Sequence, residues 1–131
     1  MPLQVQLVSP ERILFEGEAD MVVARTLSGG DLAFLPGHEP FLGALRNWPV
    51  KVALAGGGEQ RFAVHGGFAQ VDHDRVILLT DVAELPGDID VARARAAKDR
   101  AEAALREDPQ DAGAQAALER ATVRLEVAAS P

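Results

Sequence analysis

The sequence predicts an all-β N-terminal sandwich or flattened barrel followed by a C-terminal antiparallel α-helical hairpin. Up to Glu84 the chain consists of short segments in which apolar and polar residues alternate, and glycine-containing turns separate these segments. After residue 86 it becomes rich in alanine, with a single break around Pro109. A period of two is typical of strands and a period near 3.6 is typical of helices. We therefore expect a β-sandwich domain over residues 1–85 and a helical hairpin over residues 86–131.

About eight to ten short strands are expected in the first 85 residues. In the first of them, Leu3, Val5 and Leu7 alternate with glutamines. The clearest candidates are residues 3–7, 21–26, 50–54, 61–65, 68–71 and 75–80. Turn residues lie between them, at 28–30, 36–37, 56–58, 66–67 and 72–74. Evenly spaced short strands with such turns are typical of a sandwich or a barrel.

Two helices are expected in the C-terminal segment. The first, over residues 89–106, has Asp88 or Asp90 as its N-cap and ends before Pro109, because proline disfavours helix for the residue in front of it. The second covers residues 112–127. The positions expected to meet between them are Ala97, Ala101, Ala104 and Leu105 on the first helix and Leu118, Ala121, Leu125 and Ala128 on the second. Alanine buries little apolar area, at ~25 cal/mol per Å², so we expect the hairpin to be only weakly held without a partner or a ligand.

Composition excludes several classes of function. The net charge of −7 argues against a nucleic-acid partner, because such binding draws its affinity from phosphate neutralisation. The chain has no cysteine, which removes disulfides, thiolate nucleophiles and cysteine metal sites. No window approaches the ~20 apolar residues of a membrane span, so we expect any membrane contact to be indirect. Against the overall charge, the first helix carries a basic stripe, which consists of Arg93, Arg95, Lys98, Arg100 and Arg106.

One stretch carries a family resemblance. Residues 30–42 read GDLAFLPGHEPFL, and this segment resembles the signature loop of the epsilon subunit of bacterial F-type ATP synthases. The likeness continues through residues 65–71 and 76–81 and into the helical hairpin, so it covers nearly the whole chain. The order of sandwich, hinge and hairpin at this length agrees with it.

The resemblance implies a non-catalytic rotor subunit in the central stalk of a proton-translocating ATP synthase. In that family the sandwich binds the gamma subunit and the c-subunit ring, and so couples the ring to gamma. The hairpin either folds against the sandwich or extends along gamma into the alpha/beta catalytic head, where it restrains ATP hydrolysis. Asp31 and His38 match the contact with the ring and gamma, although the family often has Glu and Gly where this chain has Asp31 and Ala33. The implied location is peripheral, on the cytoplasmic side of the bacterial inner membrane.

The hairpin also resembles the ATP-binding motif of some bacterial epsilon subunits. Ile89, Asp90, Arg93 and Ala94 match the motif itself. Further matching positions are Glu84, Arg100, Arg120 and Arg124. Arginine suits a triphosphate because its planar fork of donors fits phosphate oxygens, whereas the two carboxylates suit the adenine amino group or the ribose. The resemblance thus implies ATP as a regulatory ligand, with no catalytic cofactor.

In the extended state, the resemblance implies that the basic stripe meets an acidic segment of the catalytic beta subunits. Arg93 and Arg100 belong both to the stripe and to the expected ATP site. Nucleotide binding and inhibition would then compete for the same charges, which is the differential interaction that a switch requires.

Plainer alternatives remain open for each of these features. Arginines at helical spacing are usually a solvated face with intrahelical pairs, such as Glu102 with Arg106. The turn at residues 36–37 can be purely structural, with His38 as a surface residue. A carbohydrate- or peptide-binding sandwich is a rival, although exposed aromatic residues are scarce. A small phosphoryl-transfer enzyme is another, although residues 56–58 lack the Lys and Ser or Thr of a phosphate-binding loop. No metal ligands are predicted.

Overall fold

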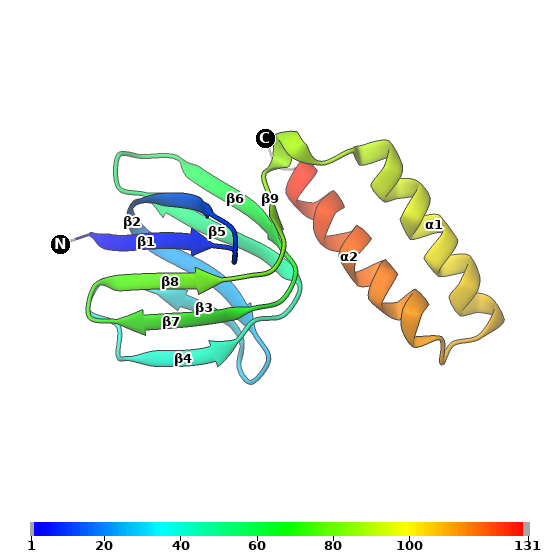
Figure 1. Cartoon of the computed structure of the whole chain (residues 1–131), viewed down its shortest axis with the longest axis horizontal. Helices are drawn as coiled ribbons and strands as arrows, with labels where there is room; N and C mark the ends of the chain where they lie inside the picture. Colours follow the sequence, from blue (N-terminus) through cyan, green and yellow to red (C-terminus); the bar gives the residue numbers. More distant parts are fainter. Residues whose placement is uncertain (1, 130–131) are drawn as a thin grey trace.

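The computed structural model describes residues 2–129, and within them the chain forms nine strands, one 3₁₀ turn and two α-helices. The strands make one lobe and the helices make a second (Figure 1). The elements are β1 (Leu3–Val8), β2 (Ile13–Thr26), β3 (Gly30–Phe34), β4 (Phe41–Ala44), β5 (Trp48–Leu54), β6 (Glu59–Val64), β7 (Phe68–Asp72), β8 (Arg75–Leu79), β9 (Ala83–Glu84), the 3₁₀ turn η1 (Pro86–Asp88), α1 (Val91–Glu107) and α2 (Ala112–Ala128). This arrangement confirms the predicted fold class.

The strands follow the order β4-β7-β8-β1-β2-β5-β6-β9, with β3 paired to β2. The β1–β8 pair is parallel, and the other strand pairs are antiparallel. The long strand β2 joins the two layers, because its first half pairs with β1 and its second half pairs with β3 and β5. A bridge between Thr26 and Leu45 brings the end of β2 close to the end of β4. The result is a flattened, twisted sandwich with its apolar core between the layers.

The core follows the predicted alternation. Leu3, Val5 and Leu7 of β1 are buried, and the residues between them face outward. The largest fully buried side chains include Phe34 and Phe62, and Phe62 meets Phe15 edge-on with ring centroids 5.4 Å apart. Burial of such side chains contributes ~1.5–3 kcal/mol each, which gives the sandwich a core of its own.

Two strand predictions are corrected by the structure. Strand β2 begins at Ile13 rather than near residue 21, because its first half pairs with β1 despite the glutamates that alternate along it. Residues 30–42 are not one loop, since β3 and β4 form at its two ends by pairing with β2 and β7. Asp31 therefore lies on a strand, and only the segment between β3 and β4 is a loop.

Both helices start at an aspartate cap. The Asp90 carboxylate accepts a hydrogen bond from the Arg93 backbone N–H at 3.0 Å, and Asp111 does the same for Ala114 at 3.0 Å. Because Asp90 is the N-cap, α1 begins at Val91, and Ile89 lies outside the helix in an extended conformation. The first helix is thus shorter at its start than predicted.

The hairpin folds back against the sandwich through α2, which lies between α1 and the sheet (Figure 1). Ala101 and Ala121 are buried, as the predicted helix interface requires. Four further residues form a separate buried cluster between the lobes, with Trp48 and Ala128 packed against it: Ala63, Ile89, Val123 and Val127. We call this cluster the seam. The part of α2 in the seam, Val123 and Val127, was not predicted, because the sequence analysis considered only the apolar residues of that helix expected to face α1.

Neither helix among residues 2–129 combines the length and the apolar character needed to cross a membrane.

Candidate functional site

A cavity of about 370 Å³ opens where the end of β9, the turn η1, α1 and α2 meet. It is lined by Glu84, Asp88, Asp90, Arg93, Ala94, Ala97, Arg100 and Arg124. The cavity therefore gathers every residue of the predicted ATP site except Ile89 and Arg120. Arginine side chains from both helices and carboxylates from the linker share this one space.

Glu84 links two side chains at the base of this cavity. One of its oxygens, Oε1, accepts a hydrogen bond from Arg124 Nε at 2.8 Å and lies 3.0 Å from His65 Nε2. Because the carboxylate accepts, the His65 Nε2–H donates. The other ring nitrogen of His65, Nδ1, is buried and has no hydrogen-bond partner among residues 2–129. The residues His65, Glu84 and Arg124 thus join strand β9 and the end of β6 to helix α2, and we call them the latch.

Burial and hydrogen bonding set the charges of the latch. Burial lowers the pKa of His65 and outweighs the opposing effect of the Glu84 carboxylate, while the positive charges of Arg124 and Arg120 lower it further. Burial alone would raise the pKa of Glu84, but hydrogen bonds from Arg124 and His65 hold this pKa below its usual value. At neutral pH the latch is therefore a neutral imidazole, a carboxylate and a guanidinium.

These directions predict that acidification weakens the docked hairpin. A lowered pKa means that released or unfolded chains bind a proton at His65 more readily, so stability is complete above pH 6.5 and falls as the pH drops below it. Because the pKa of Glu84 is also lowered, protonation of this carboxylate causes a further loss of stability below pH 4.5. Thermal unfolding followed between pH 7.5 and 5.5 should show a falling midpoint in the parent and a flatter profile in His65→Gln.

The matched control is His73→Gln, because the His73 side chain is 90% exposed. This variant should keep the profile of the parent. An unchanged profile in His65→Gln would show that His65 does not carry the pH dependence.

Three residues of the predicted site differ from the others in where the structure places them. Ile89 is buried in the seam, with 8% of its surface exposed, so it supports the cavity from below and does not line it. Arg120 is exposed and lies outside the lining. Asp90 lines the cavity and precedes α1, where its carboxylate caps the helix as one of the two predicted N-cap residues.

Arg124 also departs from the plain alternative. Instead of lying on a solvated helical face, the guanidinium of Arg124 binds Glu84, forty residues away in sequence. Three lining or supporting residues were missed by the sequence analysis: Asp88, Ala97 and His65. Ala97 lies one helical turn after Arg93, which is a usable signal, whereas His65 reaches the site only through the pairing of β6 with β9.

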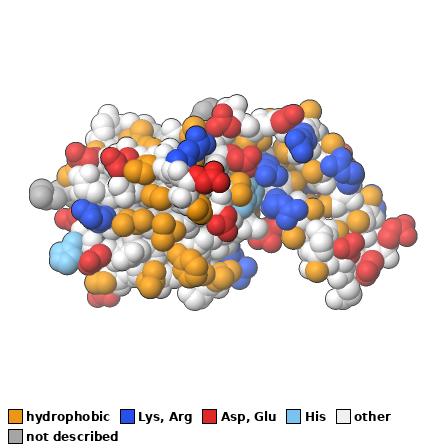
Figure 2. All heavy atoms as spheres, viewed as in Figure 1, with side chains coloured by type: hydrophobic (Ala, Val, Ile, Leu, Met, Phe, Trp, Pro, Cys, Tyr) orange, Lys and Arg blue, Asp and Glu red, His pale blue; other side chains and the backbone are white. Residues whose placement is uncertain are grey.

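The basic stripe is divided between two environments. Arg93 and Arg100 line the cavity, whereas Arg95, Lys98 and Arg106 lie outside it. Figure 2 shows Lys and Arg side chains spread over the helical lobe on the face in view.

Asp31 and His38 lie on different elements. Asp31 on β3 accepts a hydrogen bond from Arg25 Nε at 2.8 Å, and this bond lowers the pKa of the Asp31 carboxyl. His38 follows Gly37, which has a φ of 80°, a backbone conformation that a residue with a side chain adopts only with strain. The His38 imidazole packs edge-on against the Phe34 ring, with ring centroids 5.1 Å apart. The Asp74 carboxylate accepts a hydrogen bond from the Gly37 N–H at 2.8 Å and ties this loop to the β7–β8 turn.

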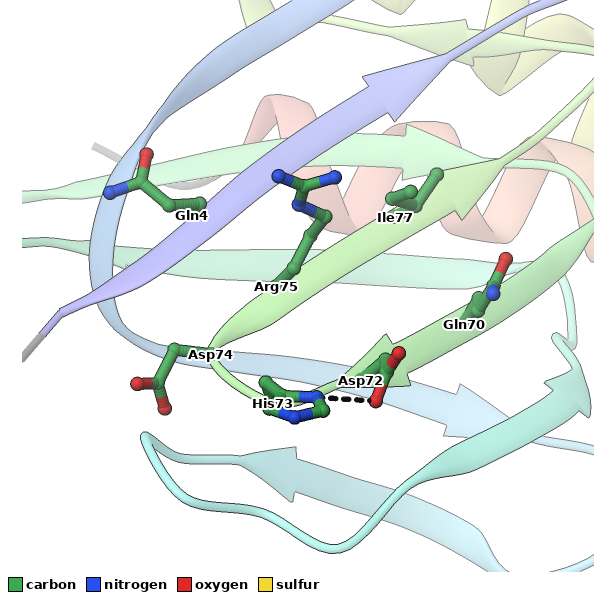
Figure 3. Close-up of a pocket in the computed structure, with 7 residues that line it drawn as sticks. All are labelled: Gln4, Gln70, Asp72, His73, Asp74, Arg75 and Ile77. Atoms are coloured by element: carbon green, nitrogen blue, oxygen red, sulfur yellow. Dashed lines mark hydrogen bonds and ion pairs between the residues drawn. The ribbon is translucent and has the colours of Figure 1, made fainter.

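Figure 3 shows a second hollow, of about 440 Å³, at that β7–β8 turn. Its lining consists of Gln4, Gln70, Asp72, His73, Asp74, Arg75 and Ile77, none of which was a predicted site residue. His73 Nδ1 lies within hydrogen-bond distance of Asp72 Oδ1, at 2.7 Å, and both side chains are exposed. Among residues 2–129 no group of His, Asp and Glu side chains has the arrangement of a metal site.

A row of apolar side chains crosses the outer face of the sandwich. Strand register places Ala44, Phe68, Leu79, Val8 and Ile13 side by side on neighbouring strands. Phe68 is 53% exposed and Ile13 is 54% exposed. Hydrophobic side chains gather over this sheet in Figure 2, and a hollow of about 520 Å³ opens beside the row. We call these five residues the apolar row.

Comparisons with known proteins agree along the whole chain. Residues 2–86 match the family described as ATP synthase, Delta/Epsilon chain, beta-sandwich domain, and residues 88–129 match the corresponding long alpha-helix domain. An ATP synthase epsilon chain of Streptomyces griseus is 46% identical over 97% of this chain and 95% of its own length. That of Brevibacillus brevis is 46% identical over 80% of this chain and 79% of its own.

Solved structures show the same fold. A chain in the mitochondrial ATP synthase of Euglena gracilis, in a structure described as OSCP/F1/c-ring, superposes with a TM-score of 0.84. It has 25% sequence identity, and the match covers 98% of this chain and 82% of that one. A chain from the central stalk/c-ring structure of Tetrahymena thermophila has a TM-score of 0.53 and 15% identity, with 97% and 93% covered, which supports the fold alone.

Proposed function

The chain belongs to the ATP synthase epsilon-chain family, and from that premise we propose that it is a non-catalytic rotor subunit whose hairpin regulates ATP hydrolysis. In this proposal the sandwich joins the c-subunit ring to gamma in a proton-translocating enzyme. The protein is then held at the cytoplasmic face of the membrane only through the complex. The observation that carries the proposal is a sandwich with a core of its own, to which the hairpin is attached by a small seam and the latch.

The comparisons favour neither rival class. A carbohydrate- or peptide-binding sandwich would require exposed aromatic residues, and Phe68 stands in a row of aliphatic neighbours rather than beside another ring. The two family models that match describe domains of the ATP synthase Delta/Epsilon chain.

We assign the gamma contact to the apolar row. A row of side chains on adjacent strands forms a flat strip, and exposed apolar strips of this kind mark protein interfaces. Its aromatic member, Phe68, has the size and central place of an interface hot spot. Asp31 and His38 are proposed for the contact with the c-subunit ring, where Arg25 already holds the Asp31 carboxylate in position.

Phe68→Asp is expected to weaken the capture of gamma by about tenfold or more, because it places a charge in the strip that gamma would cover. Co-purification of the two subunits, followed by a titration of the soluble chain with gamma, measures the change. Val91→Asp is the control, since Val91 is also exposed but lies at the start of α1. If both variants bind gamma like the parent, the apolar row is not the gamma contact.

We further propose that ATP occupies the cavity between the helices and β9. The guanidinium groups of Arg93, Arg100 and Arg124 face one cavity, and separate arginines that converge in this way suit a triphosphate. Glu84 lies in the same cavity and is available to the adenine amino group or the ribose. A ligand held by both helices and β9 favours the folded-back hairpin over the extended one.

When ATP leaves, the hairpin extends and the basic stripe becomes available to the alpha/beta catalytic head. Arg93 and Arg100 serve in both states of this proposal, so ATP and the beta subunits compete for them. Competition of this kind gives the two states different affinities for each ligand, and the coupling is reciprocal.

The nucleotide proposal predicts that ATP raises the thermal unfolding midpoint of the isolated chain. At a concentration 100 times the dissociation constant, a ligand that binds only the folded form stabilises it by about 2.7 kcal/mol. Differential scanning fluorimetry with ATP, and with GTP as a comparison, measures the rise. If ATP leaves the midpoint unchanged, the hairpin is a mechanical arm, and the assignment of the sandwich to the rotor is unaffected.

A further inference from the structure

Arg25 lies between two parts of the molecule that have separate roles in the proposed function. On one side its Nε donates to Asp31 Oδ1 at 2.8 Å, and Nη2 donates to Oδ2 over a longer distance of 3.4 Å. On the other side its guanidinium carbon lies 3.7 Å from the centroid of the Trp48 ring. The guanidinium therefore lies over an aromatic face while a carboxylate accepts its hydrogen bonds.

Trp48 continues this line of contacts to the hairpin. The indole is partly buried and packs against the seam, whose members on α2 are Val123 and Val127. Strands β3, β2 and β5, which carry Asp31, Arg25 and Trp48, are neighbours in the sheet. An unbroken chain of side-chain contacts thus runs from the edge assigned to the c-subunit ring to the surface on which the hairpin rests.

We propose that Arg25 is a positioning residue that couples the ring-facing edge of the sandwich to the docking of the hairpin. With Asp31 bound, Arg25 lies over the Trp48 ring and keeps the indole against the seam. A partner that offers a cation or a strong hydrogen-bond donor to Asp31 competes for its carboxylate and frees Arg25. The indole then loses its cover, and the seam loosens.

The inference rests on the proposed roles of Asp31 and the hairpin, but it does not depend on ATP. By reciprocity, release of the hairpin also changes how firmly Asp31 is held, so the ring-facing edge differs between the two hairpin states. The coupling is modest, because a partly exposed ion pair and one cation–π contact together change an equilibrium only by a few-fold.

The test measures amide hydrogen exchange in α2 of the full chain without nucleotide. Arg25→Ala and Asp31→Asn should each raise the exchange of the amides from Val123 to Val127, by about two- to fivefold, while amides of β7 exchange as in the parent. Arg25→Lys keeps the charge but loses the planar group, so its exchange should lie between those of the parent and Arg25→Ala. Glu59→Gln is the control, because it breaks another surface ion pair, with Arg61, on strand β6.

The control should leave α2 unchanged. If Asp31→Asn behaves like Glu59→Gln, the edge is not coupled to the hairpin and the proposal is overturned. The same holds if Arg25→Ala leaves α2 unchanged. A chain that ignores ATP but shows the expected pattern of exchange would defeat the nucleotide role and still support the coupling, so the two failures are distinguishable.

Discussion

Val123→Asp is expected to release the helical hairpin while the sandwich stays folded. Val123 is fully buried in the seam, where its neighbours are Ala63, Ile89 and Val127. A carboxylate at this place would be an unpaired charge in apolar surroundings, and a buried charge without a partner costs about 3 to 5 kcal/mol. The change also removes the burial of a valine side chain, which contributes about 1.5–3 kcal/mol, so the two effects add up at the seam. The sandwich has its own core and does not depend on the seam.

Trp48 reports this release directly. It is the one tryptophan in a chain without tyrosine, and it packs against the seam. Release should shift its emission to longer wavelength and raise amide exchange throughout α2, while β1 and β8 remain protected. Val91→Asp supplies a control that adds the same charge at an exposed position of the other helix. Loss of protection in β1 together with α2 would show that sandwich and hairpin unfold as one unit, contrary to the prediction.

The fold could be predicted because the spacing of apolar residues in each lobe is evident within short segments of the sequence. In β1, strict alternation of Leu3, Val5 and Leu7 with glutamines is sufficient to define one buried face. The first half of β2 could not be found in this way, since Leu14 and Phe15 are adjacent apolar residues and glutamates stand on both sides of Gly17. That half exists because β1 pairs with it, which is a tertiary cause.

The site could be predicted where its residues share a helix or a linker. Arg93, Ala94 and Arg100 reach one cavity because helical spacing places them on one side of α1, and Glu84 precedes them on the linker. His65 could not be predicted, because it meets Glu84 only through the β6–β9 pairing and the docking of α2. The contact of Arg25 with Trp48 likewise depends on the order of strands, which the sequence does not state.

The composition of the seam explains why the sequence predicted a weakly held hairpin but not the surface through which the hairpin contacts the sandwich. Alanine dominates both helices, so little apolar area can be buried between them or against the sheet. The position of Val123 and Val127 on the side of α2 away from α1 is what directs the hairpin to the sandwich. Sequence periodicity does not distinguish which of two apolar faces meets which neighbour.

Arg124→Ala is expected to lower the affinity for ATP by about tenfold or more, because hydrogen bonds to charged groups contribute about 1.5–3 kcal/mol. Arg124 is the cation that α2 contributes to the lining of the cavity, so its loss leaves the nucleotide bound mainly through α1. The same change removes the partner of Glu84 and weakens the latch. Both effects lower the fraction of chains with the hairpin folded back. Isothermal titration calorimetry of the full chain with ATP measures the affinity.

Arg120→Ala is the sharpest comparison, since Arg120 lies one helical turn before Arg124 on the same helix but outside the cavity. Family resemblance alone assigns both arginines to the nucleotide, whereas the geometry predicts a clearly smaller loss for Arg120→Ala. Arg106→Ala, at the far end of α1, should bind ATP like the parent. Equal losses at Arg120 and Arg124 would mean that the bound nucleotide reaches beyond the lining of the cavity to the preceding turn of α2, because residues four apart lie on the same face of a helix.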